Sequence, residues 1–477
     1  MCIPCENFRL IDKNLTNLFI TDKKFYGGAF RLILPIVALN IMHLALGFSD
    51  MLMFGRLDGA SETAIAATRI AMQPIFLFNM ILFGAMSGAA VLCSQYWGKK
   101  DTHTINSVAG TTFMLIAPIC AVFIAVSFIF APRLMSLLSN DYAVIDAAVT
   151  YLRIIVFALM FELVTGIFAG ILRSVENVKV PMFIGIGGIV INITLNAFLI
   201  FGLAGVPALG VPGVAVATLV SHFLRMLAML IYIAFLEKRI RFTLKKILDI
   251  RKVIIRDFLK YGTPVIFNEF FWGFGVTIHM AIIGAISSDA QSAYIVSNTM
   301  EAIAGISMIA FAMVAGINIG KAIGSGEGND IVVKYARTLL VFGVVAAIFT
   351  TSVVFVFRHS LIDLFGLRGE TQAYAAGLFI VVTIVLLVKT CNCIIVVGIF
   401  RGGGDTKTGM IIDMGAMYFI SIPAGFIAMY FLNLNVVFVY AALMLDEIVK
   451  LPILLILFKR RKWIKNVTRD FGENAET

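Results

Sequence analysis

Long apolar segments separated by short polar loops fill almost all of this 477-residue chain. A helix needs roughly 20 mostly apolar residues to cross the hydrocarbon core of a bilayer. Apolar runs bounded by charged residues, glycine and proline predict twelve such helices. Their approximate bounds are 33–54, 64–92, 107–130, 147–171, 181–203, 212–236, 262–286, 292–320, 335–357, 373–400, 409–432 and 436–458. We therefore expect an all-α integral membrane protein.

Composition excludes most other classes of protein. Hydrophobic residues make up 60% of the chain and charged residues 14%, whereas about a quarter of a soluble domain is charged. Twelve helices and their loops use nearly the whole length, so no attached ATPase, kinase or receptor domain is expected. Residues 1–24 lack the apolar core of a secretory signal, and we predict no signal peptide.

Basic residues set the expected orientation. The predicted outer loops contain four arginines and no lysine, whereas the most basic segments are 237–257 and 459–477. By the positive-inside rule these segments face the cytoplasm. We expect a multi-pass protein of the plasma (inner) membrane with both termini cytoplasmic. The net charge of +10 then belongs to the inner loops, so it predicts no nucleic-acid partner.

An internal repeat divides the chain. Three motifs recur in order, at offsets of 229, 226 and 228 residues: Arg31–Pro35 with Lys260–Pro264, Gln95–Gly98 with Lys321–Gly324, and Gly170–Arg173 with Gly398–Arg401. Six helices per repeat give both halves the same topology, an architecture of secondary transporters with the substrate path between the repeats. The predicted layout is an N-terminal segment 1–27, an N-half 28–236, a linker 237–257, a C-half 258–458 and a tail 459–477. The linker is expected to lie on the membrane surface, as an amphipathic helix.

Ionisable residues within the predicted helices are candidates for function, because burying a charge in the membrane is costly. The acids are Asp50, Glu162, Glu269, Glu301 and Asp413, and the bases include Arg225 and Lys389. Burial disfavours the charged form, so a buried carboxylate can take up a proton on one side of the membrane and release it on the other. The alternative is neutralisation within the protein, as by pairing Glu162 with Arg225 or Lys389 with Asp413.

Polar groups near Asp50 suggest a second chemistry. Asn192 and Asn196 lie one helical turn apart on the same face, where their amide oxygens could serve with Asp50 as ligands for Na⁺. An interhelical hydrogen bond is the structural alternative. His43, His222 and His279 have no second histidine or carboxylate close in sequence and are interpreted as packing or hydrogen-bonded residues.

Five motifs in order resemble the multidrug and toxic compound extrusion (MATE) transporters from about residue 27 to 460. They are Ser49–Arg56 (family V-D-T-x-M-x-G-R), Val91–Gly98 (V-x-x-S-Q-x-x-G), Gly170–Arg173 and Gly398–Thr406 (G-x-L-R-G-x-G-D-T), and Gly210–Thr218 (G-x-x-G-A-A-x-A-T). The resemblance implies two parallel six-helix bundles in a V around a central cavity. It also implies efflux, often of organic cations, driven by entry of Na⁺ or H⁺.

The same resemblance implies roles for single residues. Asp50 matches the first-helix acid of the N-half cation site, with Asn192, Asn196 and Thr218 beside it. Many relatives carry Asp where Asn196 stands. The Asn268–Gly273 motif is similar to N-E-x-x-W-G of one bacterial branch and indicates Glu269. Another branch has an acid in the tenth helix, where this chain has Lys389. We assign the coupling role of that acid to Asp413 in the eleventh helix.

The sequence thus predicts a cation-coupled antiporter that exports amphiphilic, cationic small molecules. Asp50, Asn192, Asn196, Thr218, Glu269 and Asp413 are its expected coupling residues, with Glu162, Glu301 and Lys389 secondary. We expect a monomer in contact with lipid, no enzymatic activity, and no cofactor beyond Na⁺ or H⁺ as coupling ion. The alternatives are a flippase for lipid-linked saccharides and a non-transporting receptor or intramembrane enzyme.

Overall fold

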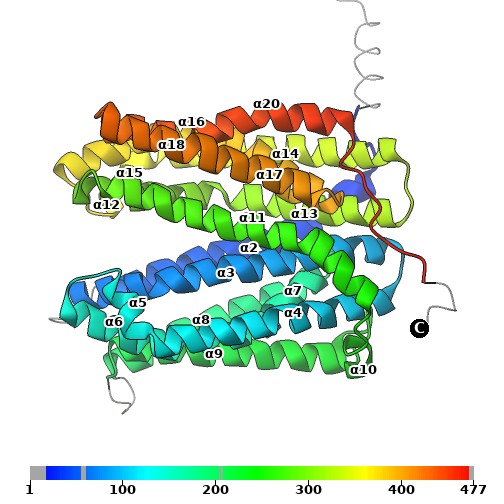
Figure 1. Ribbon diagram of the computed structural model, residues 1–477, viewed down its shortest axis with the longest axis horizontal. Helices are drawn as coiled ribbons and strands as arrows, with labels where there is room; N and C mark the ends of the chain where they lie inside the picture. Colours follow the sequence, from blue (N-terminus) through cyan, green and yellow to red (C-terminus); the bar gives the residue numbers. More distant parts are fainter. Residues whose placement is uncertain (1–17, 55–60, 203–204, 206–207, 472–477) are drawn as a thin grey trace, which may run out of the picture. The chain divides into compact units, whose positions relative to one another are not determined.

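The computed structural model describes residues 18–54, 61–202, 205 and 208–471, and every regular element in these ranges is a helix (Figure 1). The first half contains Lys23–Phe54 (α2), Ser61–Gly98 (α3), Thr102–Ile129 (α4), Ala131–Ser136 (α5), Tyr142–Ile155 (α6), Ala158–Ser174 (α7), Lys179–Phe201 (α8), Val211–Ile231 (α9) and the π-helix Tyr232–Leu236 (η2). Leu244–Ile247 (α10) follows in the linker.

The second half begins with Lys252–Gly284 (α11), Ser288–Ala304 (α12), Ile306–Gly324 (α13), Asn329–Val356 (α14), Arg358–Leu364 (α15) and Gly369–Cys393 (α16). It continues with the π-helix Ile394–Phe400 (η3), then Thr406–Ala416 (α17), Met417–Ser421 (η4), Ile422–Phe426 (α18), Ile427–Phe431 (η5), Val436–Leu443 (α19) and Leu445–Arg460 (α20). Helices are required here because a backbone in hydrocarbon must satisfy its own hydrogen bonds.

The number of membrane-spanning helices differs from the expected twelve. Among the described residues, ten helices are long and apolar enough to cross a membrane, or eleven if α6 and α7, bent by 45°, count as one. The exact count of twelve is therefore not confirmed. The last predicted span, 436–458, is divided into helices of 8 and 16 residues, and α20 contains Asp446, Glu447 and Lys450.

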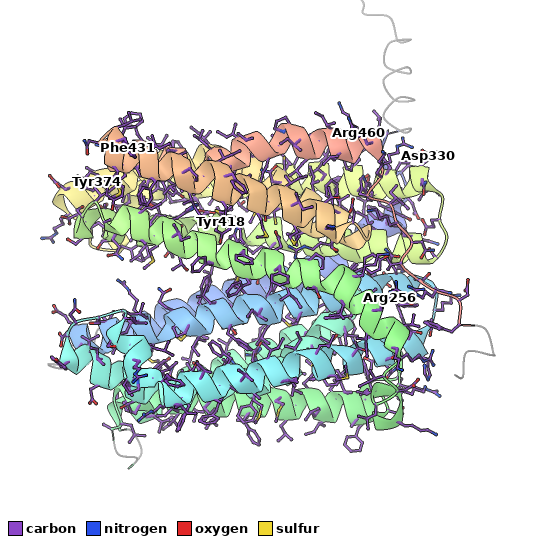
Figure 2. All side chains as sticks on the ribbon, in the orientation of Figure 1. Arg256, Asp330, Tyr374, Tyr418, Phe431 and Arg460 are labelled. Atoms are coloured by element: carbon purple, nitrogen blue, oxygen red, sulfur yellow. The ribbon has the colours of Figure 1, made fainter. Side chains whose placement is uncertain are left out.

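Labelled residues mark the two ends of the C-half bundle. Figure 2 places Asp330 and Arg460 at one end of these helices, Tyr374 and Phe431 at the other, and Tyr418 between them. At the first of these ends, Arg461 forms an ion pair with Asp330 at 2.6 Å. This end carries the loops that the sequence predicts to be cytoplasmic.

The chain forms two compact units whose boundaries fall inside helices. Unit 1 contains residues 1–37, 94–101 and 274–477, and unit 2 contains 38–93 and 102–273. The repeat-related helices α2 and α11 each cross from one unit to the other, in opposite directions. Helix α2 begins in unit 1 and ends in unit 2, whereas α11 begins in unit 2 and ends in unit 1. The last turn of α3 also belongs to unit 1.

Small residues permit close helix packing inside unit 2. A Cβ atom at Gly88 of α3 would lie 2.7 Å from the Cα of Gly262 in α11, and one at Gly84 would lie 2.6 Å from the Cα of Ile266. Contacts this short to backbone atoms leave room only for hydrogen. Close backbone approach at small residues is a main source of helix association in membranes.

The linker departs from the expected surface helix. Its residues Leu244–Ile247 form the four-residue α10, which packs on α4, and its last six residues are the start of α11. Ser107 donates a hydrogen bond to the Asp249 carbonyl at 2.6 Å, and Gly110 leaves room for the Ile247 carbonyl. The linker is thus fixed to α4.

Candidate functional site

Three of the predicted coupling residues lie together in unit 2. Asn192 of α8 donates hydrogen bonds to Thr218 and Ser221 of α9, each at 3.2 Å, and accepts one from Asn196 at 3.1 Å. Asn192 and Asn196 are 4% and 0% exposed. The interhelical hydrogen bond expected as the structural alternative is therefore present, between Asn192 of α8 and α9. Asp50 lies in α2, but its side chain is outside the described part of the chain, so the Na⁺ site remains a prediction.

A second polar group continues from Thr218. The Thr218 carbonyl accepts a hydrogen bond from His222 Nδ1 at 2.8 Å, so the proton of the neutral ring is on Nδ1. His222 Nε2 then faces Glu162 Oε2 at 3.5 Å, and Arg225 Nη1 contacts the same oxygen at 3.2 Å. The pairing of Glu162 with Arg225 is confirmed. His222, interpreted from sequence as remote from carboxylates, lies beside one in space.

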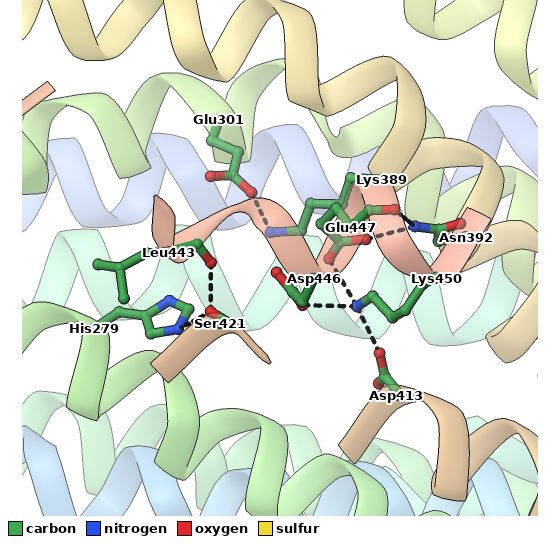
Figure 3. Close-up of polar contacts among 10 residues, drawn as sticks. All are labelled: His279, Glu301, Lys389, Asn392, Asp413, Ser421, Leu443, Asp446, Glu447 and Lys450. Carbon is green, nitrogen blue, oxygen red and sulfur yellow. Dashed lines mark hydrogen bonds and ion pairs between the residues drawn. The ribbon is translucent and has the colours of Figure 1, made fainter. Parts of the chain in front are cut away.

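The largest buried ionic group among the described residues lies in unit 1, where Lys450 is surrounded by carboxylates (Figure 3). Its ammonium contacts Asp413 at 2.8 Å and Asp446 and Glu447 at 3.0 Å each. The Lys450 side chain is only 2% exposed. The other carboxylate oxygen of Glu447 accepts a hydrogen bond from Asn392 at 2.8 Å. Asp413, predicted as a coupling residue on its own, is thus one member of a network.

The network extends to two further predicted residues. Lys389 of α16 forms a short ion pair with Glu301 of α12, and the Tyr440 hydroxyl lies 3.5 Å from the same carboxylate. The sequence-based pairing put Lys389 with Asp413; the structure pairs Lys389 with Glu301 and Asp413 with Lys450. We call Glu301, Lys389, Asp413, Asp446, Glu447 and Lys450 the C-half ion network.

The C-half ion network contains more carboxylates than ammonium groups. Four carboxylates face two ammonium groups, so the fully ionised network carries two surplus negative charges. Burial makes such a surplus unfavourable, and binding of a cation relieves it. The network can therefore take up positive charge, most simply as a proton on a carboxylate.

A hydrogen-bond chain lies next to the network in Figure 3. Ser421 of η4 donates to the Leu443 carbonyl, so its oxygen accepts from His279 Nε2 at 2.8 Å. Leu443 is the last residue of α19, and helix ends leave carbonyls without partners along the helix. His279, interpreted as a hydrogen-bonded residue, thereby supports the break between α19 and α20.

Glu269 and Asp413 belong to different units. Glu269 lies in α11, is 7% exposed, and belongs to unit 2, whereas Asp413 belongs to unit 1. Sequence reasoning missed Asp446, Glu447 and Lys450 altogether. Their signal was the i, i+3 and i, i+4 spacing of two acids and a lysine inside an apolar segment.

The family model MatE matches residues 35–198 and 264–427. The chain belongs to the MATE family. The two matches begin and end 229 residues apart (264 minus 35, and 427 minus 198), which is the offset of the Pro35 and Pro264 motifs. The repeat predicted from three short motifs is therefore confirmed over two segments of equal length.

Curated relatives and solved structures agree with this assignment. "Probable multidrug resistance protein YoeA" of Bacillus subtilis is 24% identical over 88% of this chain and 91% of its own length. "Probable multidrug resistance protein NorM" of Thermotoga maritima is 24% identical over 91% and 92%. A MOP superfamily transporter from Pyrococcus furiosus superposes with a TM-score of 0.80 at 16% identity, covering 93% of this chain and 96% of that one.

These findings make the MATE chain a multi-pass membrane transporter with the fold of that family. The identity to the solved structures is low, and their likeness concerns the fold alone. Members of the family act as transporters rather than enzymes.

Proposed function

We propose that this transporter is an antiporter that exports amphiphilic, cationic small molecules in exchange for protons entering the cell. Membership of the MATE family supports the transport class. Relatives named as multidrug resistance proteins support a broad substrate range. The 22 methionines and 41 phenylalanines supply the adaptable apolar surface that varied ligands require.

The C-half ion network is the observation that carries the coupling part of this proposal. Its carboxylates lie on helices α12, α17 and α20, so a cation bound among them acts on several helices at once. A cation and a cationic substrate that neutralise the same surplus exclude one another. Mutually exclusive binding is sufficient to couple their fluxes in opposite directions.

A proton suits this network better than Na⁺. The Lys450 ammonium already occupies the point where the carboxylates of Asp413, Asp446 and Glu447 converge. A proton needs no such cavity, since it binds to one carboxylate oxygen. Once protonated, that carboxyl no longer holds Lys450 as an ion, and the contact between α17 and α20 through Asp413 weakens.

The proposed setting is the plasma membrane, with both termini cytoplasmic and the protein acting as a monomer. The lysine-free outer loops support this orientation. Asp50 and Glu269 remain candidate coupling residues of unit 2, and Na⁺ at Asp50, Asn192 and Asn196 is the alternative chemistry.

Purified protein in liposomes tests the proposal. Uptake of a fluorescent organic cation would be measured under an imposed pH gradient and, separately, an imposed Na⁺ gradient. We expect the pH gradient alone to drive uptake. Uptake driven by Na⁺ alone would reject proton coupling, and no uptake under either gradient would reject the antiporter.

Three matched substitutions locate the coupling site. Asp413→Asn should lower proton-driven uptake at least about tenfold, in line with coupling free energies of about 1–3 kcal/mol. Glu269→Gln should insert and fold but lose drug-driven ion exchange; unchanged exchange would exclude Glu269. Glu370→Gln, an exposed acid at the start of α16, is the control and should leave uptake unchanged.

A further inference from the structure

The chain after α20 forms an ordered extended segment, which we call the C-terminal strap (residues 461–471). It leaves the helix at Arg461, which has a positive φ of 56°, and it is drawn in red beyond α20 in Figure 1. Trp463 and Val467 of the strap are 1% and 4% exposed. A loop that buries large apolar side chains at two points is packed on the protein and does not trail in solvent.

Gln95 of α3 is the centre of the strap contacts. Its amide nitrogen donates to the carbonyls of Gly402 and Lys465, both at 3.1 Å, and its amide oxygen accepts from the Val467 N–H at 2.8 Å. Gln95 is 0% exposed, and both of its N–H donors and its oxygen are used. A buried amide whose hydrogen bonds are all formed holds three segments together, namely α3, the loop after η3 and the strap.

The strap is also fastened to the loop that follows η3. The Lys465 N–H donates to the Gly403 carbonyl at 2.8 Å, and its ammonium contacts Asp405 at 2.9 Å. A Cβ atom at Gly403 would lie 2.6 Å from the Trp463 ring, so glycine is needed there for the ring to pack. This loop belongs to the repeated glycine-arginine motif found in the sequence.

Further contacts reach the end of α3. The Lys99 ammonium binds the Asp470 carboxylate at 2.5 Å and the Arg469 carbonyl at 2.6 Å. The Arg469 N–H donates to the Tyr96 hydroxyl at 3.3 Å. The strap therefore contacts Gln95 and Tyr96 in the last turn of α3 and Lys99 directly after the helix.

The attached part of α3 is the part that lies in unit 1. Residues 94–101 belong to unit 1, although residues 61–93 of the same helix belong to unit 2. Within unit 1 this last turn also packs closely on α13, because Gly98 and Gly324 admit the carbonyls of Lys321 and Gln95. The strap thus adds polar contacts to the end of a helix whose remaining length belongs to the other unit.

We propose that the C-terminal strap is a latch, which holds the end of α3 in unit 1 and must release it in each transport cycle. This inference rests on the proposed antiport, because exchange of a site between two sides of the membrane requires the units to rearrange. Closing the latch favours the conformation seen here, and opening it favours the alternative one. The strap thereby sets the rate at which the protein alternates between the two conformations, although it lies outside the ion and substrate sites.

Labelling of a strap cysteine measures the latch directly. Val467→Cys keeps the N–H that binds Gln95 and places a thiol at a buried position; the six native cysteines are replaced first. We expect slow maleimide labelling at rest and at least about tenfold faster labelling when Gln95→Ala removes three hydrogen bonds, each about 0.5–1.5 kcal/mol. Lys462→Ala, on the exposed part of the strap, is the control and should leave the rate unchanged.

Turnover gives the decisive comparison. Labelling of the Val467→Cys protein should accelerate when substrate and a pH gradient are supplied together, and should not accelerate with either alone. Equal labelling at rest and during measured dye uptake would overturn the latch and leave the antiporter intact. Absence of dye uptake by the cysteine-free protein would reject the antiporter and the latch with it.

A cross-link tests the opposite direction. Lys99→Cys and Asp470→Cys together, joined by a short reducible bis-methanethiosulfonate, should stop dye uptake, and reduction should restore it. Each single cysteine variant treated in the same way should transport normally, since an exposed ion pair contributes little. Normal uptake by the cross-linked protein would show that the strap need not open, which would contradict the proposal.

Discussion

Replacement of Lys450 by Met removes the ammonium at the centre of the C-half ion network while keeping a long, flexible side chain. The ammonium contacts three carboxylates at 2.8, 3.0 and 3.0 Å, and the side chain is 2% exposed. Water therefore has little access to take its place. Loss of one partner from a buried ion pair typically costs about 3–5 kcal/mol, because an uncompensated charge stays behind. We expect Lys450→Met to destabilise the protein by at least that amount.

The acids themselves supply an internal check. With Lys450 absent, the surplus of negative charge in the ionised network rises from two to three. Asp446→Asn removes one of these charges, so the double variant should be more stable than the sum of the single effects predicts. We expect a coupling of about 1–3 kcal/mol, the range for residues in one ionic network.

The midpoint temperature of unfolding in detergent is a suitable assay. A loss of 3–5 kcal/mol should lower the midpoint by at least about 5 °C. Lys459→Met, at the exposed end of the same helix, should shift it by less than about 1 °C, since surface changes have small effects. Equal midpoints for the Lys450 and Lys459 variants would refute the central role of the buried ammonium.

Two packing predictions concern unit 2. Gly88→Ala should destabilise the protein by about 1–3 kcal/mol, because its Cβ would meet the Gly262 backbone, whereas Gly187→Ala in α8 meets nothing within 4 Å and should be neutral in the same thermal assay. Asn192→Ala should cost about 1–3 kcal/mol, since the hydrogen-bond partners on Thr218, Ser221 and Asn196 lose their contact; Thr194→Ala on the exposed face of α8 is the control. Equal stability within either pair would contradict the corresponding contact.

The fold was largely predictable because its dominant signals are local. Apolar length and loop punctuation located the helices, and each half of the repeat could be recognised from short motifs such as those at Pro35 and Pro264. The failures concern polar interruptions. The segment 436–458 was interpreted as one plain span, although Asp446, Glu447 and Lys450 interrupt its apolar surface and the helix breaks at Met444.

The candidate sites were predictable one residue at a time but not as groups. Asn192 and Asn196 were recognised as neighbours because helical spacing fixes their common face. The partners of Lys389 and Asp413 depend on which helices pack together. Spacing along one helix does not reveal that packing. The same holds for Gln95, whose partner Lys465 lies 370 residues away. A basic tail with one tryptophan carries no sequence signal for such a contact.

The two halves of the repeat have diverged in charge, and this divergence bears on their division of labour. In unit 2 the described group has one acid, Glu162, which is paired with Arg225 and lies beside His222. In unit 1 four acids surround two lysines. A group without surplus negative charge gains little from a cation, whereas a group with surplus negative charge is relieved by one. Proton exchange should therefore depend more on Asp413 than on Glu162.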